Sequence, residues 1–165
     1  MCLFLKFSPS GFRQLFCQFF DIITARGRVC HTVQIGSSYF VEIAKLRAFK
    51  LLWGNVLTAY NAVPTLPRLF ATTSPLKAND DVNIHKIQAT TQAMSAVMAG
   101  IETLTVAPSE PNDFGRRIAR NVQHLLSLES YLDRVADPAA GSYYIEKLTE
   151  QLAEAAWAEF QKQTH

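Results

Sequence analysis

Three arginines in close succession carry the clearest binding chemistry in the sequence. Arg116, Arg117 and Arg120 lie in the run DFGRRIARN, and neighbouring guanidinium groups can bind a phosphate or a carboxylate together. On an amphipathic helix, however, arginines more often lie on a solvated face or pair with carboxylates of the same protein. By itself, the sequence favours the solvated face.

A second candidate is the turn that opens the segment DPAAGSYYIE, residues 137–146. Small residues before a helix leave N–H groups free at its amino terminus, and such a site suits an anion. The alternative is structural, with Asp137 and Ser142 serving as the turn and cap that start the last helix. The structural interpretation is the one we favour.

The histidines and paired carboxylates do not form a convincing catalytic or metal site. Asp80 with Asp81, and Asp133 with Asp137, are explained by capping and turn roles. His31 lies in a predicted strand, where it is either a core or barrel-lining residue or one that faces a substrate. No metal site is expected, because the four histidines share no metal-ligand spacing: His31, His85, His124 and His165.

Composition places the chain among globular proteins of one domain. It has 165 residues, of which 48% are hydrophobic and 18% charged, with a net charge of +2. These values disfavour a disordered chain and a strongly basic nucleic-acid surface, and motifs for nucleotide loops and serine hydrolases are absent from the sequence. The three cysteines have no disulfide or zinc spacing, so a reducing, cytoplasmic setting is expected.

The first 27 residues differ from the rest. They hold six of the eleven phenylalanines, and Lys6, Pro9 and Arg13 interrupt the apolar run before it reaches the length of a signal core or membrane span. We therefore expect neither targeting nor membrane insertion. This segment is expected to be a packed hydrophobic helix or not to be native coding sequence, whereas residues 28–165 form the domain proper.

From residue 28 onward, strands and helices alternate. Predicted strands at 28–36, 67–74 and 102–108 are each followed by a helix, the helices being capped by Ser37 or Ser38, Asp80 or Asp81, and Asn112 or Asp113. A further helix follows residue 142. This order predicts an α/β fold with parallel strands, either a small open sheet or an arc of a (β/α)8 barrel.

In a barrel, ligands would meet residues 34–38, 72–79 and 105–112, which follow the carboxyl ends of the strands.

Apolar spacing predicts which face of each helix is buried. The predicted buried stripes are Ile84, Ile87, Thr91, Met94 and Val97 or Met98 in the second helix; Phe114, Ile118, Val122, Leu125 and Leu126 or Leu128 in the third; and Tyr144, Ile145, Leu148, Leu152, Ala155 and Ala156 in the last.

Long runs of the sequence resemble the methylmalonyl-CoA mutase family over about residues 28–160. They are IGSSYFVEIAKLRAFKLLW, ATTQAMSAVMAGIETLTV and DFGRRIARNVQHLLSLESYLDRVADPAAGSYYIEKLTEQLAEAAW. The resemblance implies the last three βα units and a final helix of a (β/α)8 TIM-type barrel. In this family the barrel holds a coenzyme A ester along its axis, while a separate domain holds adenosylcobalamin for radical isomerisation of methylmalonyl-CoA and succinyl-CoA.

Carried over by residue, the resemblance gives two substrate-binding candidates. Arg28 matches a family arginine that contacts coenzyme A phosphate, and Thr103 matches a serine near the substrate. Residues 72–76 read TTSPL where catalytic chains carry Gln-Thr-Ser-Gly-Trp, and the cobalamin-ligand motif DxHxxG is absent. No catalytic residue is therefore assigned, and this chain is not expected to bind the cofactor directly.

These departures make the sequence most similar to the small, non-catalytic subunit of heterodimeric mutases. Its expected partner is the large, catalytic subunit, with a coenzyme A ester as a possible ligand and neither nucleic acid nor membrane as partners. Two alternatives stay open: a truncated catalytic mutase chain, and a stand-alone α/β binding module. The module is disfavoured because part of a barrel leaves apolar sheet edges uncovered.

Overall fold

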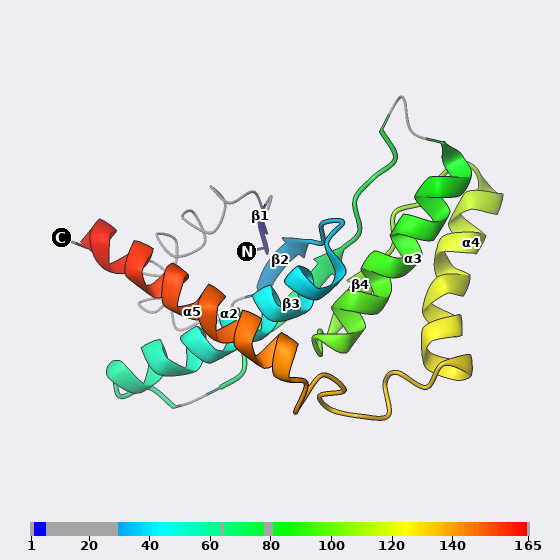
Figure 1. Ribbon diagram of the computed structural model, residues 1–165. Helices are drawn as coiled ribbons and strands as arrows, with labels where there is room; N and C mark the ends of the chain where they lie inside the picture. The colour runs from blue at the N-terminus through cyan, green and yellow to red at the C-terminus, as the bar shows by residue number, and fades with distance from the viewer. Residues whose placement is uncertain (1, 6–29, 64, 78–80, 165) are drawn as a thin grey trace.

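The computed structural model describes residues 2–5, 30–63, 65–77 and 81–164 of the chain (Figure 1). Strands and helices alternate through most of this part, as the sequence predicted. The elements, in chain order, are β1 (Cys2–Leu5), β2 (Cys30–Gln34), α2 (Tyr39–Ala59), β3 (Arg68–Thr72), α3 (Val82–Met98), β4 (Thr103–Thr105), α4 (Asp113–His124), the π-helix η1 (Leu125–Glu129) and α5 (Tyr143–Thr164).

The four strands form one parallel sheet in the order β1-β2-β3-β4. The α/β class with parallel strands is thus confirmed. β1 was not predicted, and it is the described part of the Phe-rich segment 1–27. Within the described residues the sheet stays open, with β1 and β4 as its edges.

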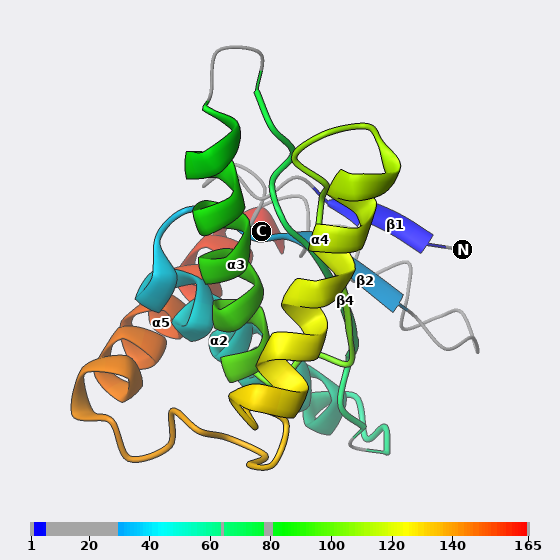
Figure 2. The ribbon, with the colours of Figure 1, turned by 90° about the vertical axis from the view of Figure 1, so that its right-hand side faces the viewer.

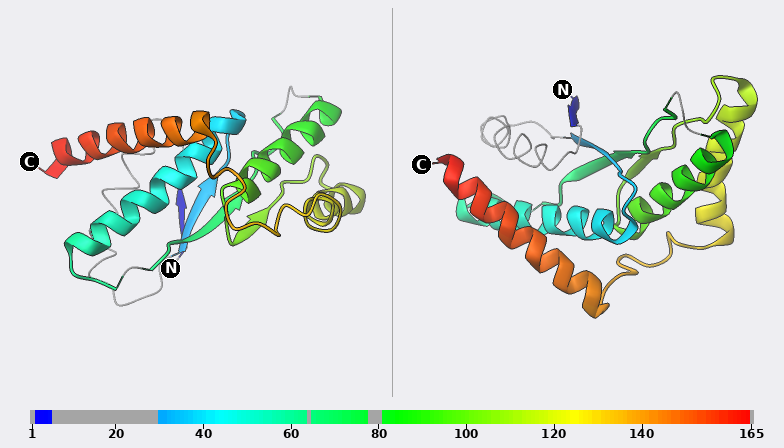
Figure 3. Two further views of the ribbon diagram at one scale, coloured as in Figure 1. Left: turned by 60° about the horizontal axis from the view of Figure 1, so that its bottom comes forward. Right: turned by 45° about the horizontal axis from the view of Figure 1, so that its top comes forward.

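Helices cover one side of the sheet (Figure 3). Val33 of β2, Ile35 just after it, and Leu69 and Ala71 of β3 are almost fully buried and pack in one core with α2. α2 is itself buried on most of its surface, because α5 lies across its outer side (Figure 1). The layers are therefore sheet, α2, and α5 outside it.

α3 begins where the sequence predicted, but it buries a different face. The Asp81 carboxylate caps it by accepting hydrogen bonds from the N–H groups of Asn83 and Ile84. The predicted stripe is wrong at Ile84 and Ile87, which are 55% and 68% exposed. The buried face consists of small and polar residues, since small side chains let α3 approach its neighbours closely: His85, Ala89, Gln92, Ala93, Ser95 and Ala96.

α4 packs beside α3, as Figures 1 and 2 show. Asn112 caps it through the N–H of Gly115 at 2.7 Å. Of the predicted stripe, Val122 and Leu126 are buried, whereas Phe114, Leu125 and Leu128 are exposed. One reason is the π-helix after His124, which rotates the following side chains relative to an α-helix.

A close approach fixes the start of α4. A Cβ atom on Gly115 would lie 2.3 Å from the carbonyl oxygen of Glu110. Only glycine fits between the helix and the preceding turn, which places α4 rigidly against that turn.

The DPAAGS turn is part of the framework, as we expected. The N–H of Glu146 donates to the Ser142 carbonyl at the start of α5. Arg47 of α2 pairs with the Asp137 carboxylate and, at 2.7 Å, with Glu146. A single guanidinium thereby connects α2 to the turn and to the first turn of α5. On the predicted stripe of α5, Ile145 and Ala156 are buried, but the prediction is wrong at Tyr144, which is 59% exposed, and at Ala155, which is also exposed.

Replacing Arg47 by methionine should loosen α5. Both carboxylate partners are more than a third exposed, so we expect a loss of about 2 kcal/mol of unfolding free energy, less than for a fully buried pair. Urea denaturation would measure it. Arg134→Met is the control, because Arg134 is exposed and lies over the Tyr131 ring; equal losses in both variants would refute the proposed role of Arg47.

Candidate functional site

The face of the sheet opposite the helices is the best candidate for a ligand surface. Parallel register places side chains of β2, β3 and β4 in two rows on this face. The rows are Thr32, Phe70 and Thr103, and Gln34, Thr72 and Thr105. Thr103 and Thr105 are exposed, Phe70, Thr72 and Gln34 are partly exposed, and Thr32 is buried.

This surface is polar but uncharged in both rows. Hydroxyl and amide groups can donate to and accept from a neutral polar ligand, and Phe70 adds an apolar contact. Thr103, the predicted substrate contact, lies on β4 opposite Phe70. The other predicted contact, Arg28, lies outside the described residues.

Beyond the carboxyl ends of β3 and β4, buried polar side chains form a connected network. The His85 ring lies between the two loops, with Nε2 3.0 Å from the Ser74 carbonyl oxygen and Nδ1 2.9 Å from Ser109 Oγ. Gln92 Oε1 accepts from the Ser74 N–H at 2.9 Å, and Thr73 Oγ1 accepts from the Ala107 N–H at 2.8 Å. The network fixes one loop relative to the other.

These bonds occupy the His85 ring. A carbonyl oxygen only accepts, so Nε2 donates to the Ser74 carbonyl, while Nδ1 is hydrogen-bonded to the Ser109 hydroxyl. Both ring nitrogens are thus engaged, which leaves no lone pair for a metal or for a substrate proton. His85 is 3% exposed. We assign it to positioning the loops, not to chemistry.

Sequence reasoning missed this network. Its signal was present, because His85 and Gln92 are seven residues apart and interrupt the apolar pattern of α3 on one helical face. Interpreting that signal required the partners Ser74 and Ser109, and only the fold brings these together.

His31 belongs to the core. It lies on the helix-facing side of β2, 5.2 Å from the Phe49 ring and 5.4 Å from the Trp53 ring, both roughly edge-on. It is 1% exposed, and burial lowers its pKa from 6.5 to about 4. The core interpretation is therefore confirmed, and the substrate-facing one is wrong.

Of the two predicted carboxylate pairs, three members have structural partners, and Asp80 lies outside the described residues. Asp81 caps α3, Asp133 accepts from the Ser127 hydroxyl at 2.7 Å, and Asp137 pairs with Arg47. Among the described residues no group of His, Cys, Asp or Glu is arranged to hold a metal ion. In the same part of the chain, no helix is long and apolar enough to cross a membrane.

Comparison with known proteins gives one consistent family. The family model described as "Methylmalonyl-CoA mutase" matches residues 13–164. The chain is similar to the methylmalonyl-CoA mutase small subunit of Porphyromonas gingivalis, with 39% identity over 143 residues, which is 81% of this chain and 23% of that protein.

Two relatives from Streptomyces virginiae show that sequence identity does not distinguish a small subunit from a large one. The chain is 40% identical to the methylmalonyl-CoA mutase small subunit over 131 residues, and 41% identical to the large subunit over 133 residues. Each match covers 74% of this chain, with 21% and 18% of the respective relative. The chain thus spans about a fifth of the length of the relatives it matches.

Proposed function

The chain belongs to the methylmalonyl-CoA mutase family, and from this membership we propose that it is a small-subunit-like part of the mutase barrel. In this role it acts with a catalytic large subunit in the adenosylcobalamin-dependent isomerisation of methylmalonyl-CoA and succinyl-CoA. The supporting observation is the sequence of residues 72–76, TTSPL, at the end of β3 and in the loop after it. Identity to small and large subunits is nearly equal, so the proposal of a small subunit depends on these residues.

The fold supports a barrel arc. Parallel strands with helices on one side and an uncovered polar face are what a segment of a (β/α)8 barrel presents before closure. We propose that β1 and β4 pair with strands that lie outside the described residues. The uncovered face would then line the axis of the barrel.

Substrate contact is proposed at two positions. Thr103 would offer its hydroxyl to the coenzyme A ester from the uncovered face, and Arg28 would bind a phosphate of the same ester. The remaining hydroxyl and amide groups of this face, at Thr72, Thr105 and Gln34, would help to bind the ester and to exclude water from it.

The described residues do not fit cobalamin binding. At the carboxyl edge of the sheet, His85 has both ring nitrogens engaged, and Ser74 donates its hydroxyl to the Ile35 carbonyl at 2.9 Å. Both groups thus bond to other parts of the protein, which leaves neither free to meet a cofactor. We propose that the partner chain holds adenosylcobalamin, which supplies the radical chemistry, and that the complex works in the cytoplasm.

A truncated catalytic mutase chain is the second candidate, favoured by the 41% identity to a large subunit. A stand-alone binding module is the weakest alternative, because it gives the two sheet edges no partner.

Co-purification tests the proposal. The full chain, expressed with the mutase large subunit of the same organism, should elute with it as one complex on size-exclusion chromatography. Isomerase activity should require the large subunit, and Thr103→Val and Arg28→Ala should raise the KM for the ester. Independent elution of the two chains would refute the subunit role, and an unchanged KM in both variants would refute the substrate contacts.

A further inference from the structure

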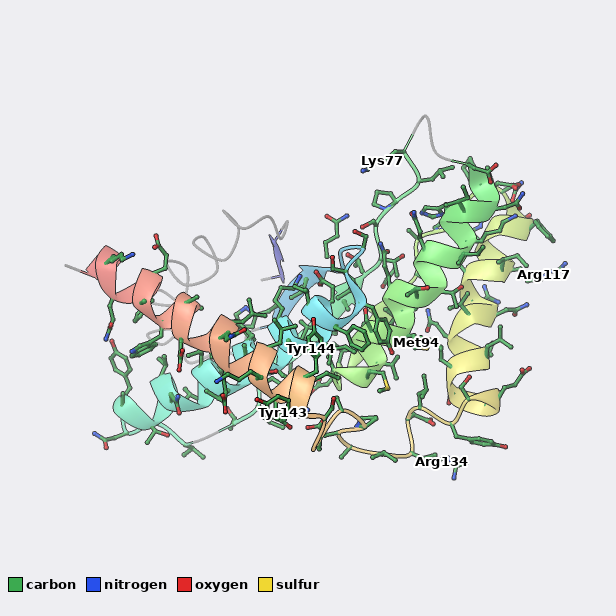
Figure 4. The ribbon with its side chains drawn as sticks, viewed as in Figure 1. Lys77, Met94, Arg117, Arg134, Tyr143 and Tyr144 are labelled. Carbon is green, nitrogen blue, oxygen red and sulfur yellow. The ribbon has the colours of Figure 1, made fainter. Side chains whose placement is uncertain are left out.

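The outer face of α4 has a charge pattern that neither the core nor the proposed function uses. Gly115, Ala119 and Val122 are buried and face the rest of the molecule. At 100° per residue, Arg116, Arg117 and Arg120 lie on the opposite side, and all three are exposed. Figure 4 shows Arg117 projecting away from the helix and its neighbours.

Few intramolecular partners neutralise these arginines. Arg116 pairs with Asp113, whose side chain is 97% exposed. Arg117 lies over the Phe114 ring at 5.7 Å, and among the described residues Arg120 makes no ion pair. The face therefore keeps an excess of positive charge in a protein whose net charge is only +2.

Helix stability does not explain the position of the arginines. Cations stabilise the carboxyl end of a helix, where they oppose its dipole, whereas all three arginines precede the last turn of α4, which ends at His124. The same segment carries an exposed aromatic ring: Phe114 is 49% exposed. Lys86 of α3 lies beside this face, with Nζ 5.8 Å from the centre of that ring and 3.8 Å from a carboxylate oxygen of Glu110.

The helix presents these groups rigidly. The close approach of Gly115 to Glu110 and the Asn112 cap hold the amino end of α4 in place. A backbone that is already rigid loses little conformational entropy when a partner binds, so the entropic cost is confined to the side chains. Arginine and aromatic residues are also the types enriched at the energetic centres of protein interfaces.

We propose that the outer face of α4, made by Phe114, Arg116, Arg117 and Arg120 with Lys86 beside it, is a docking surface for an acidic segment of a partner polypeptide. Carboxylates of that segment would accept hydrogen bonds from the guanidinium groups, and Phe114 would pack against its aliphatic stems. This inference is independent of the subunit role, because it concerns the helical exterior and not the uncovered face of the sheet.

Binding of a fluorescein-labelled oligoglutamate peptide to the full chain, followed by fluorescence anisotropy, tests the proposal. In the triple variant Arg116→Gln, Arg117→Gln, Arg120→Gln, the Kd should rise at least about tenfold, and in Phe114→Ala about threefold. Raising the salt concentration should weaken binding to the unmodified chain more than to the triple variant.

The matched control removes the same charge elsewhere. Arg134→Gln, Lys147→Gln and Lys162→Gln together neutralise three exposed cations outside α4, and this variant should bind within about twofold of the unmodified chain. Equal loss in both triple variants would mean that net charge alone drives binding, and would overturn the proposal. So would tighter, arginine-dependent binding of a labelled DNA duplex, which would identify a nucleic-acid surface. No mutase partner is used, so either result is separate from complex formation.

Discussion

Phe49→Ala should lower the free energy of unfolding by about 4 kcal/mol, because it removes a ring from the core between the sheet and α2. Phe49 is 2% exposed and packs among His31 and Trp53, with ring centres 5.2 and 6.3 Å away. Its neighbours are His31 of β2 and Trp53 of its own helix, so a cavity there weakens the packing between the sheet and α2. Small domains have only about 5–15 kcal/mol of stability in total.

The same substitution elsewhere on α2 provides the control. Phe40 is 50% exposed, with its ring against Tyr39 and Tyr144, so Phe40→Ala should cost about 1 kcal/mol or less. Denaturation in urea, monitored by circular dichroism, compares the two. If Phe49→Ala prevents folding, Phe49→Leu leaves a smaller cavity and should give an intermediate loss. Equal effects at positions 40 and 49 would contradict the placement of the core.

Acid should destabilise this protein through His31. Because burial holds the pKa of His31 at about 4, against 6.5 in the unfolded chain, the unfolded state binds a proton that the folded state excludes. Above pH 6.5 the difference has no effect. As the pH falls from 6.5 towards 4, the free energy of unfolding falls by about 1.4 kcal/mol per pH unit, or by about 3 kcal/mol in total.

His31→Phe isolates this contribution. Phenylalanine fills the space between Phe49 and Trp53 with a ring that does not titrate, so the variant should lose less stability than the unmodified chain between pH 7 and 4.5. Urea denaturation at several pH values gives both curves, and their difference removes the effect of the carboxylates that both proteins share. Parallel curves would show that His31 does not control the acid response.

Local sequence chemistry determined much of the fold. The alternation of strands and helices and the start of α5 after Ser142 were predicted correctly. So were the caps at Asp81 and Asn112, each as one of two neighbouring candidates, whereas Ser38 begins α2 without a side-chain cap bond. Each depends on residues within a few positions of one another. Caps, turns and strand propensity act over that range, so they can be recognised without a structure. The resemblance to the mutase family was likewise present in the sequence and is confirmed.

The tertiary structure decided which face of each helix is buried and which residues far apart in the chain become partners. Spacing assigned Ile84 and Ile87 to the core of α3, but close helix packing selects small residues there and leaves both isoleucines outside. The spacing of apolar residues shows which of them share a helix face. It does not show how closely the neighbouring helix or strand approaches that face.

The same distinction explains the two histidines. His31 and His85 have the same side chain, yet one lies between two aromatic rings and the other is bonded to Ser74 and Ser109. The sequence determined the strand and the helix that carry them. Only the parallel packing of β2, β3 and β4 with α2 and α3 decided their surroundings, because hydrogen bonds and ring contacts between residues far apart in the chain depend on where the elements meet.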